Sequence, residues 1–192
     1  MNKNFKKTLK KIWYFIWEDD SLLSWIVNVV IAFVLVKFII YPGLGLLLGT
    51  THPVVAVVSG SMEHNNLDFD TWWQQNYNLY SDYGIDKEDF SSYKFKNGFN
   101  KGDLLVLVGA DEVNIGDLLV FNGDAPGPII HRVVKIDILN KKLYAQTKGD
   151  NNGGSRPDEF GITEERVIGK GVFRIPYLGW FKLGLLKLIG KA

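Results

Sequence analysis

A serine, a histidine and two aspartates follow one another along this chain in an order that could support nucleophilic catalysis. Ser61 ends a short apolar run in Ser59-Gly60-Ser61-Met62, and His131 lies much later, inside a second apolar run. A hydroxyl becomes a good nucleophile when a base takes its proton, and histidine, with a pKa near neutrality, suits that task. A carboxylate on the other imidazole nitrogen would fix the tautomer and stabilise the cation. Asp150 and Asp158 follow His131, so the set predicts serine-type hydrolysis.

Among the three histidines, His131 is the preferred base. It alternates with Ile129 and Val133 in a strand-like run, so its side chain should share their buried face and be held rigidly. A structurally satisfied core histidine is the alternative interpretation. His52 and His64 lie in loop-like segments. A metal site built from His64, His131 and the aspartates matches no typical zinc spacing, and the chain has no cysteine.

A long apolar segment precedes these residues. Leu22 to Tyr41 is apolar except for Ser24, Asn28 and Lys37, and as a helix it would reach about 30 Å, enough to cross a hydrocarbon core. We therefore expect a transmembrane helix within residues 21–48, with a kink or stop at its proline-glycine pair. A cleavable signal peptide is the rival interpretation, but the apolar run is long and no small-residue cleavage site follows it.

The charges around the span predict its direction. Lysines are frequent in residues 1–20, whereas no Lys or Arg occurs between Lys37 and Lys87. This asymmetry places residues 1–20 in the cytoplasm as a basic segment, and the main domain outside the cell membrane. The same basic segment could form an amphipathic helix in the membrane interface. A net charge of +1 gives no reason to expect nucleic acid as a partner.

Residues 51–175 are predicted to form a mainly β domain. Short apolar runs alternate with Gly-Asp and Asn-rich turns and have no regular helices between them, which favours an antiparallel sheet or barrel over an α/β fold. The expected strands are residues 54–58, 104–108, 118–121, 129–136, 143–147 and 167–173.

Residues 65–100 interrupt this β pattern with an aromatic, polar and acidic insertion. Two short helices are expected there, at residues 70–80 and 86–93, opened by Asp70 and Asp86 as N-caps. The insertion could form a lid over the site or a small helical cap packed on the sheet.

The C-terminal segment, residues 176–192, is apolar but short. Lys182 and Lys187 interrupt it, which favours an interfacial, membrane-associated helix over a second span. Packing of this helix against the domain's own core is the alternative.

Taken in order, these blocks resemble type I signal peptidases, specifically the archaeal and endoplasmic-reticulum branch. The resemblance implies a signal-peptidase-like antiparallel β fold and a membrane-bound serine endopeptidase. Such an enzyme removes N-terminal signal peptides from exported preproteins, cleaving after small residues, and needs no metal or organic cofactor. Its partners would be preproteins, the lipid bilayer and the protein-export machinery. The matching segments are Val55–Glu63, Lys101–Leu105, Gly116–Phe121, Ile130–Val133 and Thr147–Asn152.

The same resemblance assigns roles to individual residues. Ser61 would be the nucleophile, His131 the general base, and Ser59 with the backbone N–H of Ser61 the oxyanion hole. The family's orienting aspartate follows the first aspartate of its loop more closely than Asp158 follows Asp150. Asp158 is preferred for this role and Asp150 is expected to be structural or auxiliary, but both stay candidates. A hypothesis from a different class is a catalytically inactive, membrane-tethered β domain that binds exported chains.

Overall fold

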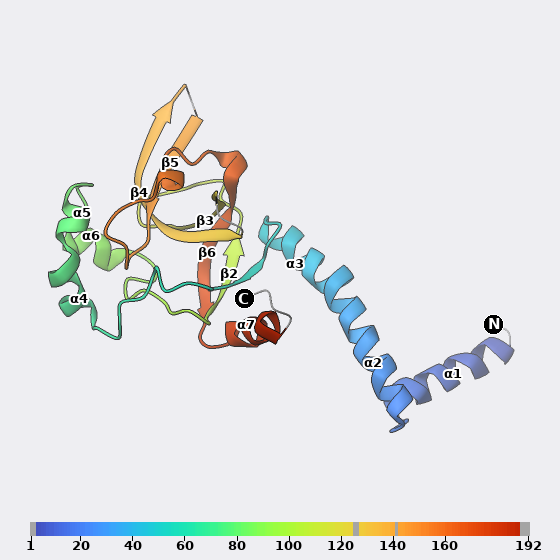
Figure 1. Ribbon diagram of the computed structural model, residues 1–192. Helices are drawn as coiled ribbons and strands as arrows, with labels where there is room; N and C mark the ends of the chain where they lie inside the picture. Colours follow the sequence, from blue (N-terminus) through green and yellow to red (C-terminus); the bar gives the residue numbers. More distant parts are fainter. Residues whose placement is uncertain (1–2, 125–126, 141, 189–192) are drawn as a thin grey trace. The chain divides into compact units, whose positions relative to one another are not determined.

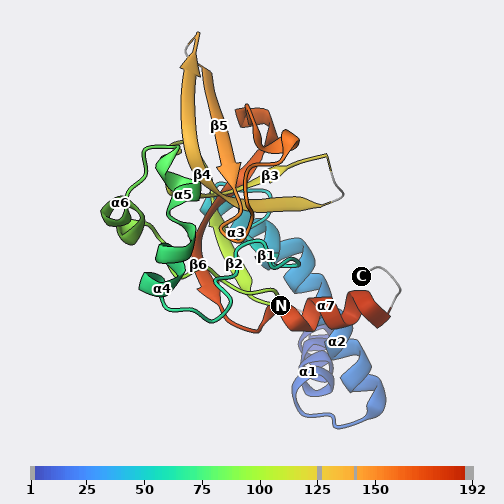
Figure 2. The same ribbon diagram turned by 60° about the vertical axis from the view of Figure 1, so that its left-hand side comes forward.

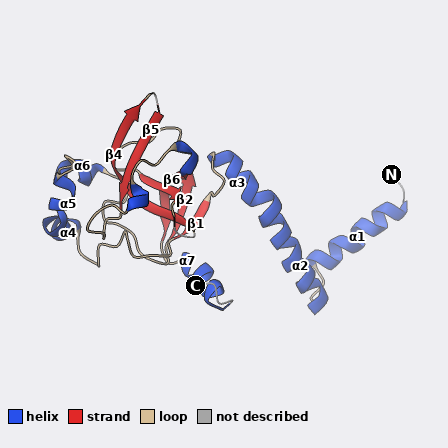
Figure 3. Cartoon of the chain, turned by 45° about the horizontal axis from the view of Figure 1, so that its top comes forward, coloured by secondary structure: helices blue, strands red, loops and turns tan. Residues whose placement is uncertain are grey.

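The computed structural model describes residues 3–124, 127–140 and 142–188, which divide into two compact units. The first comprises the chain up to Leu47 and is helical, and the second, from Leu48 onward, is built on a β-sheet with short helices (Figure 3).

In the first unit, polar side chains join two helices. Helix α1 (Lys3–Trp17) is followed after a short connection by α2 (Leu22–Leu35). Ser24 Oγ donates a hydrogen bond to the carbonyl of Phe15, and Asn28 Nδ2 donates to the carbonyl of Ile16 at 2.9 Å. These carbonyls belong to the last turn of α1, which has no intrahelical donors for them. Two of the three polar residues of the apolar segment, Ser24 and Asn28, therefore satisfy carbonyls at the end of α1.

The long apolar helix expected from the sequence is present. Helix α2 continues through a π-helical turn (Val36–Ile40) into α3 (Tyr41–Leu48), so that Leu22–Leu48 is a helix of 27 residues, long and apolar enough to cross a membrane. Of the kink or stop expected at Pro42-Gly43, the stop is wrong, because the helix continues to Leu48. The widened π turn ends at Ile40, two residues before Pro42, whose ring and missing N–H would disturb a regular α-helix.

In the described part of the second unit, six strands form one sheet in the order β1-β2-β6-β3-β4-β5, and every neighbouring pair is antiparallel. This confirms the predicted mainly antiparallel β fold. The strands are β1 (Val54–Ala56), β2 (Leu104–Val108), β3 (Leu118–Asn122), β4 (Pro128–Leu139), β5 (Lys142–Lys148) and β6 (Val167–Ile175). Strands β4 and β5 form a long hairpin that extends past the other strands (Figures 1 and 2).

Strand β1 is shorter than predicted, because the chain leaves the regular ladder after Ala56. Val57 instead exchanges backbone hydrogen bonds with the turn before β2: its N–H donates to the carbonyl of Asp103, and its carbonyl accepts from Gly102. The following residues are thereby free to form the loop that carries Ser61.

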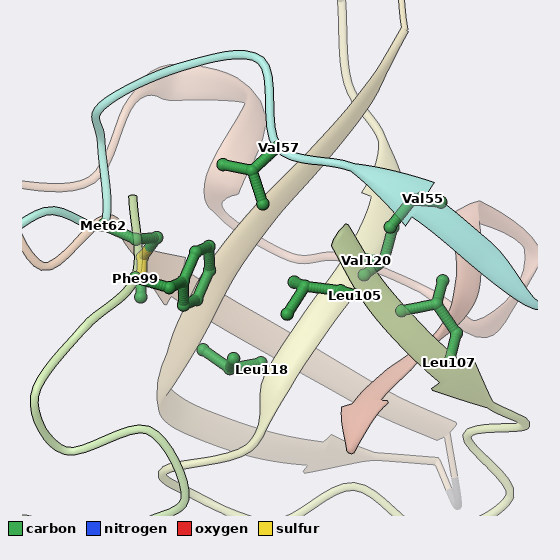
Figure 4. Packing of buried hydrophobic residues seen from close by; sticks show 8 residues of the cluster. All are labelled: Val55, Val57, Met62, Phe99, Leu105, Leu107, Leu118 and Val120. Carbon is green, nitrogen blue, oxygen red and sulfur yellow. The ribbon is translucent and has the colours of Figure 1, made fainter. Parts of the chain in front are cut away.

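Two apolar clusters hold the sheet and this loop together. One cluster joins β1, β2 and β3 to Met62 and Phe99 (Figure 4). The other is formed by β3, β4 and β5 with Ile162. Met62 is only 1% exposed, so the residue next to Ser61 is anchored in the core. The members of the first cluster are Val55, Val57, Met62, Phe99, Leu105, Leu107, Leu118 and Val120.

The insertion is a helical cap packed on the sheet. Within residues 65–100 the structure has α4 (Phe69–Asn76), α5 (Asn78–Ser81) and α6 (Lys87–Ser92), where two helices were expected. Asp86 caps α6 as predicted, but α4 is capped by Asp68 rather than Asp70. The aromatic side chains of the insertion cluster with Val134 of β4, and the helices lie beside that strand in Figure 2.

Helix α7 (Gly179–Leu188) has a packed side and an exposed side. Leu183 is buried, and Trp180 lies so close to Gly102 that a Cβ there would meet its Nε1 at 2.0 Å. Phe181 is 76% exposed and Tyr177, just before the helix, is 74% exposed. The helix therefore packs partly on its own domain and leaves aromatic side chains uncovered.

Candidate active site

The Ser61 loop is tied to the turn that precedes β2. The Glu63 carboxylate accepts the backbone N–H of Lys101 at 2.9 Å, and the Glu63 N–H donates to the carbonyl of Gly60 at 3.1 Å. These bonds and the buried Met62 side chain fix the backbone on both sides of Ser61, whose side chain is half-buried at the surface of the domain.

His131 lies on β4 opposite Leu119 of β3 and is 3% exposed. The alternation of the strand places it on the face of Ile129 and Val133, as the sequence predicts. Its Nε2 lies 2.9 Å from Ser61 Oγ. The structure therefore brings Ser61 and His131 within hydrogen-bond distance, so that the imidazole of a potential general base contacts the hydroxyl of a potential nucleophile.

The partner on the other ring nitrogen is Glu159. Its Oε1 forms a short hydrogen bond with His131 Nδ1, and the same oxygen accepts the hydroxyl of Thr147 at 3.1 Å. The other oxygen, Oε2, accepts the backbone N–H of Arg156 at 2.7 Å. Glu159 is fully buried, so its carboxylate is held by a strand residue, a backbone amide and the imidazole.

Neither aspartate predicted from the sequence lies at this position. In the described residues, Asp158 Oδ2 accepts the backbone N–H of Asp124 and a guanidinium N–H of Arg156, both at 3.0 Å, while its buried Oδ1 has no hydrogen-bond partner. Asp150 pairs with Arg132. The reason is local geometry: Asp158 and Glu159 are neighbours in a short 3₁₀ turn (Pro157–Glu159), so their side chains point in different directions and only one can face His131.

Sequence reasoning missed Glu159 because it sought an aspartate. The available signal was an acidic residue three positions after Arg156, the spacing at which an N-terminal capping carboxylate bonds back to the backbone. In the structure the Arg156 N–H donates to Glu159 Oε2 at 2.7 Å, and the Glu159 N–H donates to the backbone carbonyl of Arg156 at 3.0 Å.

Asp150 forms a buried ion pair with Arg132. Arg132 Nε lies 2.9 Å from Asp150 Oδ1, and Nη2 lies 2.7 Å from Oδ2. Burial by itself raises the pKa of Asp150, but the positive charge of Arg132 and the hydrogen bonds from His64 and Arg132 outweigh it and hold that pKa well below its usual range. Asp150 is therefore a carboxylate at neutral pH and accepts hydrogen bonds only.

The loop after β5 donates hydrogen bonds to the backbone around Ser61. The N–H of Asn151 donates to the carbonyl of Ser61 at 2.8 Å, and its side-chain amide donates to the carbonyl of Gly60 at 3.1 Å. Gly149 fits closely here, since an added Cβ would lie 2.8 Å from the Ser61 carbonyl oxygen and 2.9 Å from His131 Nε2. This approach explains why a glycine stands in the loop.

Lys148, at the end of β5, is a buried cation beside this loop. Its Nζ donates to the carbonyl of Gly149 at 3.1 Å and lies 4.4 Å from the ring centroid of Tyr80. Burial lowers the pKa of Lys148 to about 8, even though the nearby carboxylate of Asp150 opposes this effect.

A cleft of about 400 Å³ opens at Ser61 and His131. Ser59 is at its edge, with its hydroxyl 3.1 Å from Ser61 Oγ, where a second hydroxyl can serve as a donor to an oxyanion. The lining residues of the cleft are Ala56, Val57, Val58, Ser59, Ser61, Met62, Phe99, Gly127, Pro128, Ile129, Ile130, His131, Asn152 and Arg156.

The remaining histidines have other surroundings. His64 is buried against Trp72 and Asp150, whereas His52 is exposed. Among the described residues, no three His, Asp or Glu side chains gather in an arrangement that could hold a metal ion.

Comparison with known proteins finds relatives that carry the name signal peptidase complex catalytic subunit. The chain is 26% identical to SEC11 of Colletotrichum graminicola over 172 residues, which cover 80% of this chain and 81% of the relative. It is 28% identical to SEC11 of Plasmodium falciparum over 164 residues, covering 82% and 71%. It is also 28% identical to SEC11C of Canis lupus familiaris over 170 residues, covering 79% and 71%. No protein-family model matches the chain.

Proposed function

Because this chain is a distant homologue of the SEC11 catalytic subunits, in the endoplasmic-reticulum and archaeal branch of the type I signal peptidases, we propose that it removes signal peptides from exported preproteins. It would do so as a membrane-bound serine endopeptidase. The observation that carries this proposal is the 2.9 Å approach of Ser61 Oγ to His131 Nε2, with Glu159 on the other ring nitrogen.

Acylation begins when Ser61 Oγ attacks the carbonyl carbon of the scissile peptide bond. His131 Nε2 takes the hydroxyl proton, and the Glu159 carboxylate stabilises the resulting imidazolium without taking its proton. The tetrahedral intermediate then expels the amine as the C–N bond breaks, and His131 donates the proton to that amine. The signal peptide is left as an ester on Ser61, and the mature protein departs with a new N-terminus.

Deacylation repeats these steps with water. His131 takes a proton from a water molecule as it attacks the ester carbonyl, and then returns the proton to Ser61 Oγ when the C–O bond breaks. In both halves the negative oxygen would be stabilised by the Ser59 hydroxyl and the backbone N–H of Ser61. A donor of this kind contributes about 3–4 kcal/mol in other serine proteases.

Glu159 takes the role for which the sequence suggested Asp158 or Asp150. It is buried, it contacts Nδ1, and Thr147 and Arg156 fix its orientation. A fixed carboxylate at Nδ1 keeps the hydrogen on that nitrogen, so that Nε2 is free to accept the serine proton.

The membrane arrangement is part of the same proposal. Residues 1–20 would lie in the cytoplasm, Leu22–Leu48 would anchor the chain, and residues 51–175 would act outside the membrane. The exposed Tyr177 and Phe181 favour contact of the segment after β6 with the lipid interface. Preproteins would arrive from the export machinery with their signal peptides still in the bilayer, which explains why such a protease is anchored there.

The test is preprotein processing by the detergent-solubilised full chain and by its Ser61→Ala variant. We expect the wild type to release the mature protein and the variant to release none, with equal folding of both checked by thermal unfolding. Equal processing by both proteins would overturn the assignment of Ser61. Processing by neither would instead support the inactive, chain-binding alternative.

A further inference from the structure

We propose that His64 and the helical insertion it precedes position the Ser61 loop by holding Asp150 in place. This inference rests on the proposed function, because it concerns the same catalytic site. It gives residues 65–100 a role as part of the scaffold of that site.

His64 is placed to hold the carboxylate of Asp150. It is 3% exposed, its ring stacks on that of Trp72 with centroids 3.7 Å apart and planes 3° apart, and its Nε2 lies 3.2 Å from Asp150 Oδ2. Its Nδ1 is buried without a hydrogen-bond partner in the described residues. An N–H at Nδ1 would have no acceptor, so the ring carries its hydrogen on Nε2 and donates to the carboxylate.

Helices of the insertion complete the surroundings of Asp150. The hydroxyl of Tyr80, in α5, donates to Asp150 Oδ1 at 2.8 Å. Burial and the nearby Asp150 charge raise the pKa of Tyr80 well above its usual value, so this hydroxyl keeps its proton. Arg132 holds the same carboxylate and also donates to the carbonyls of Lys94 and Phe95, at the end of the insertion.

From Asp150 the connection to the nucleophile is direct. Its backbone N–H meets Met62 Sδ at 3.3 Å, and the next residue, Asn151, donates to the carbonyls of Ser61 and Gly60. A displaced Asp150 would therefore move Met62 and the backbone of Ser61 together. Misplacing a reacting group by about 1 Å can cost about 100-fold in rate.

Two substitutions separate the hydrogen bond of His64 from its stacking. His64→Phe keeps an aromatic ring on Trp72 but cannot donate to Asp150. His64→Gln loses the stack, but its amide nitrogen can reach the place of Nε2 and donate. We expect His64→Phe to lower kcat about tenfold or more with KM nearly unchanged, and His64→Gln to restore kcat to within about threefold of the wild type.

The control is His52→Phe, the same exchange at an exposed histidine outside the site, which we expect to leave kcat unchanged. Tyr80→Phe removes another donor to Asp150 and should lower kcat in the same direction. If thermal unfolding shows that His64→Phe does not fold, the kcat of Tyr80→Phe tests the proposal in its place. Wild-type kcat in His64→Phe, or in Tyr80→Phe where His64→Phe is unfolded, would overturn the proposal. A His64→Gln variant no better than a folded His64→Phe would do the same.

A second readout separates this inference from the proposed function. The rate at which a fluorophosphonate probe labels Ser61 depends on the geometry of the serine and its base, and needs no preprotein. Labelling should be slowed in His64→Phe and restored in His64→Gln. If the wild type is labelled but cleaves no preprotein, the proposed substrate is wrong and the labelling rates still decide the role of His64. A wild type that is neither labelled nor active would overturn both proposals.

Discussion

Replacing Glu159 by glutamine is the sharpest test of the proposed catalytic machinery, because it keeps the shape of the side chain and removes its charge. In the folded protein Oε1 accepts from His131 and Thr147, and Oε2 accepts the backbone N–H of Arg156. A glutamine amide offers one acceptor and one donor group in place of two acceptors. With its oxygen on the Arg156 N–H, its NH₂ group faces His131 Nδ1.

That NH₂ group would select the wrong imidazole tautomer. Nδ1 would become the acceptor and Nε2 would carry the hydrogen, so Nε2 could no longer take the proton of Ser61. The corresponding change in a well-characterised Ser-His-Asp protease lowers kcat by about 10⁴-fold. For Glu159→Gln we expect a loss of about 10³–10⁴-fold, equivalent to about 4–5.5 kcal/mol of transition-state stabilisation.

The assay is single-turnover and steady-state processing of a preprotein by the detergent-solubilised full chain. KM should change little, because Glu159 lies behind His131 and is not part of the cleft lining. The matched control is Asp158→Asn, which keeps an acceptor for the Asp124 N–H and should retain activity within about tenfold of the wild type. The reasoning is refuted if Glu159→Gln stays within about threefold of the wild type, or if Asp158→Asn alone loses activity by about 10³-fold.

Two further predictions concern the end of β5 and the loop that follows it. Gly149→Ala should abolish measurable processing, because the added Cβ would press on the Ser61 carbonyl and His131 Nε2. The control is Gly153→Ala, whose added Cβ would meet open space and which should match the wild type. Equal processing rates for the two variants would contradict this account. Between about pH 8 and about pH 10.4, Lys148 binds fewer protons in the folded than in the unfolded state. Burial of its positive charge therefore lowers the free energy of unfolding by its full amount below about pH 8, and this loss of stability disappears as pH rises through the range. Comparing the free energy of unfolding of wild type and Lys148→Met across this range should show that the wild type gains stability relative to the variant; a constant difference would be the contrary result.

Much of the fold was predictable because it depends on local sequence pattern. The apolar run from Leu22 is long enough to be a membrane helix whatever surrounds it. The alternation around His131 predicted both its strand and its buried face, and the structure confirms both. The number of helices in the insertion and the residue at which the first one begins were harder to predict. Asp68 and Asp70 are both plausible caps, and Asp68 is the one that has an extended backbone and accepts the N–H of Thr71.

The sequence by itself determined the order of Ser61 and His131, the apolar helix and the antiparallel strands, because residue type and period carry that information. Only the tertiary structure decided that Ser61 and His131 meet at 2.9 Å, and that Glu159 rather than Asp158 or Asp150 faces Nδ1. The physical reason is direction. Adjacent residues of one short turn project to different sides, and which carboxylate is buried beside His131 depends on Thr147 of β5 and the backbone of Arg156.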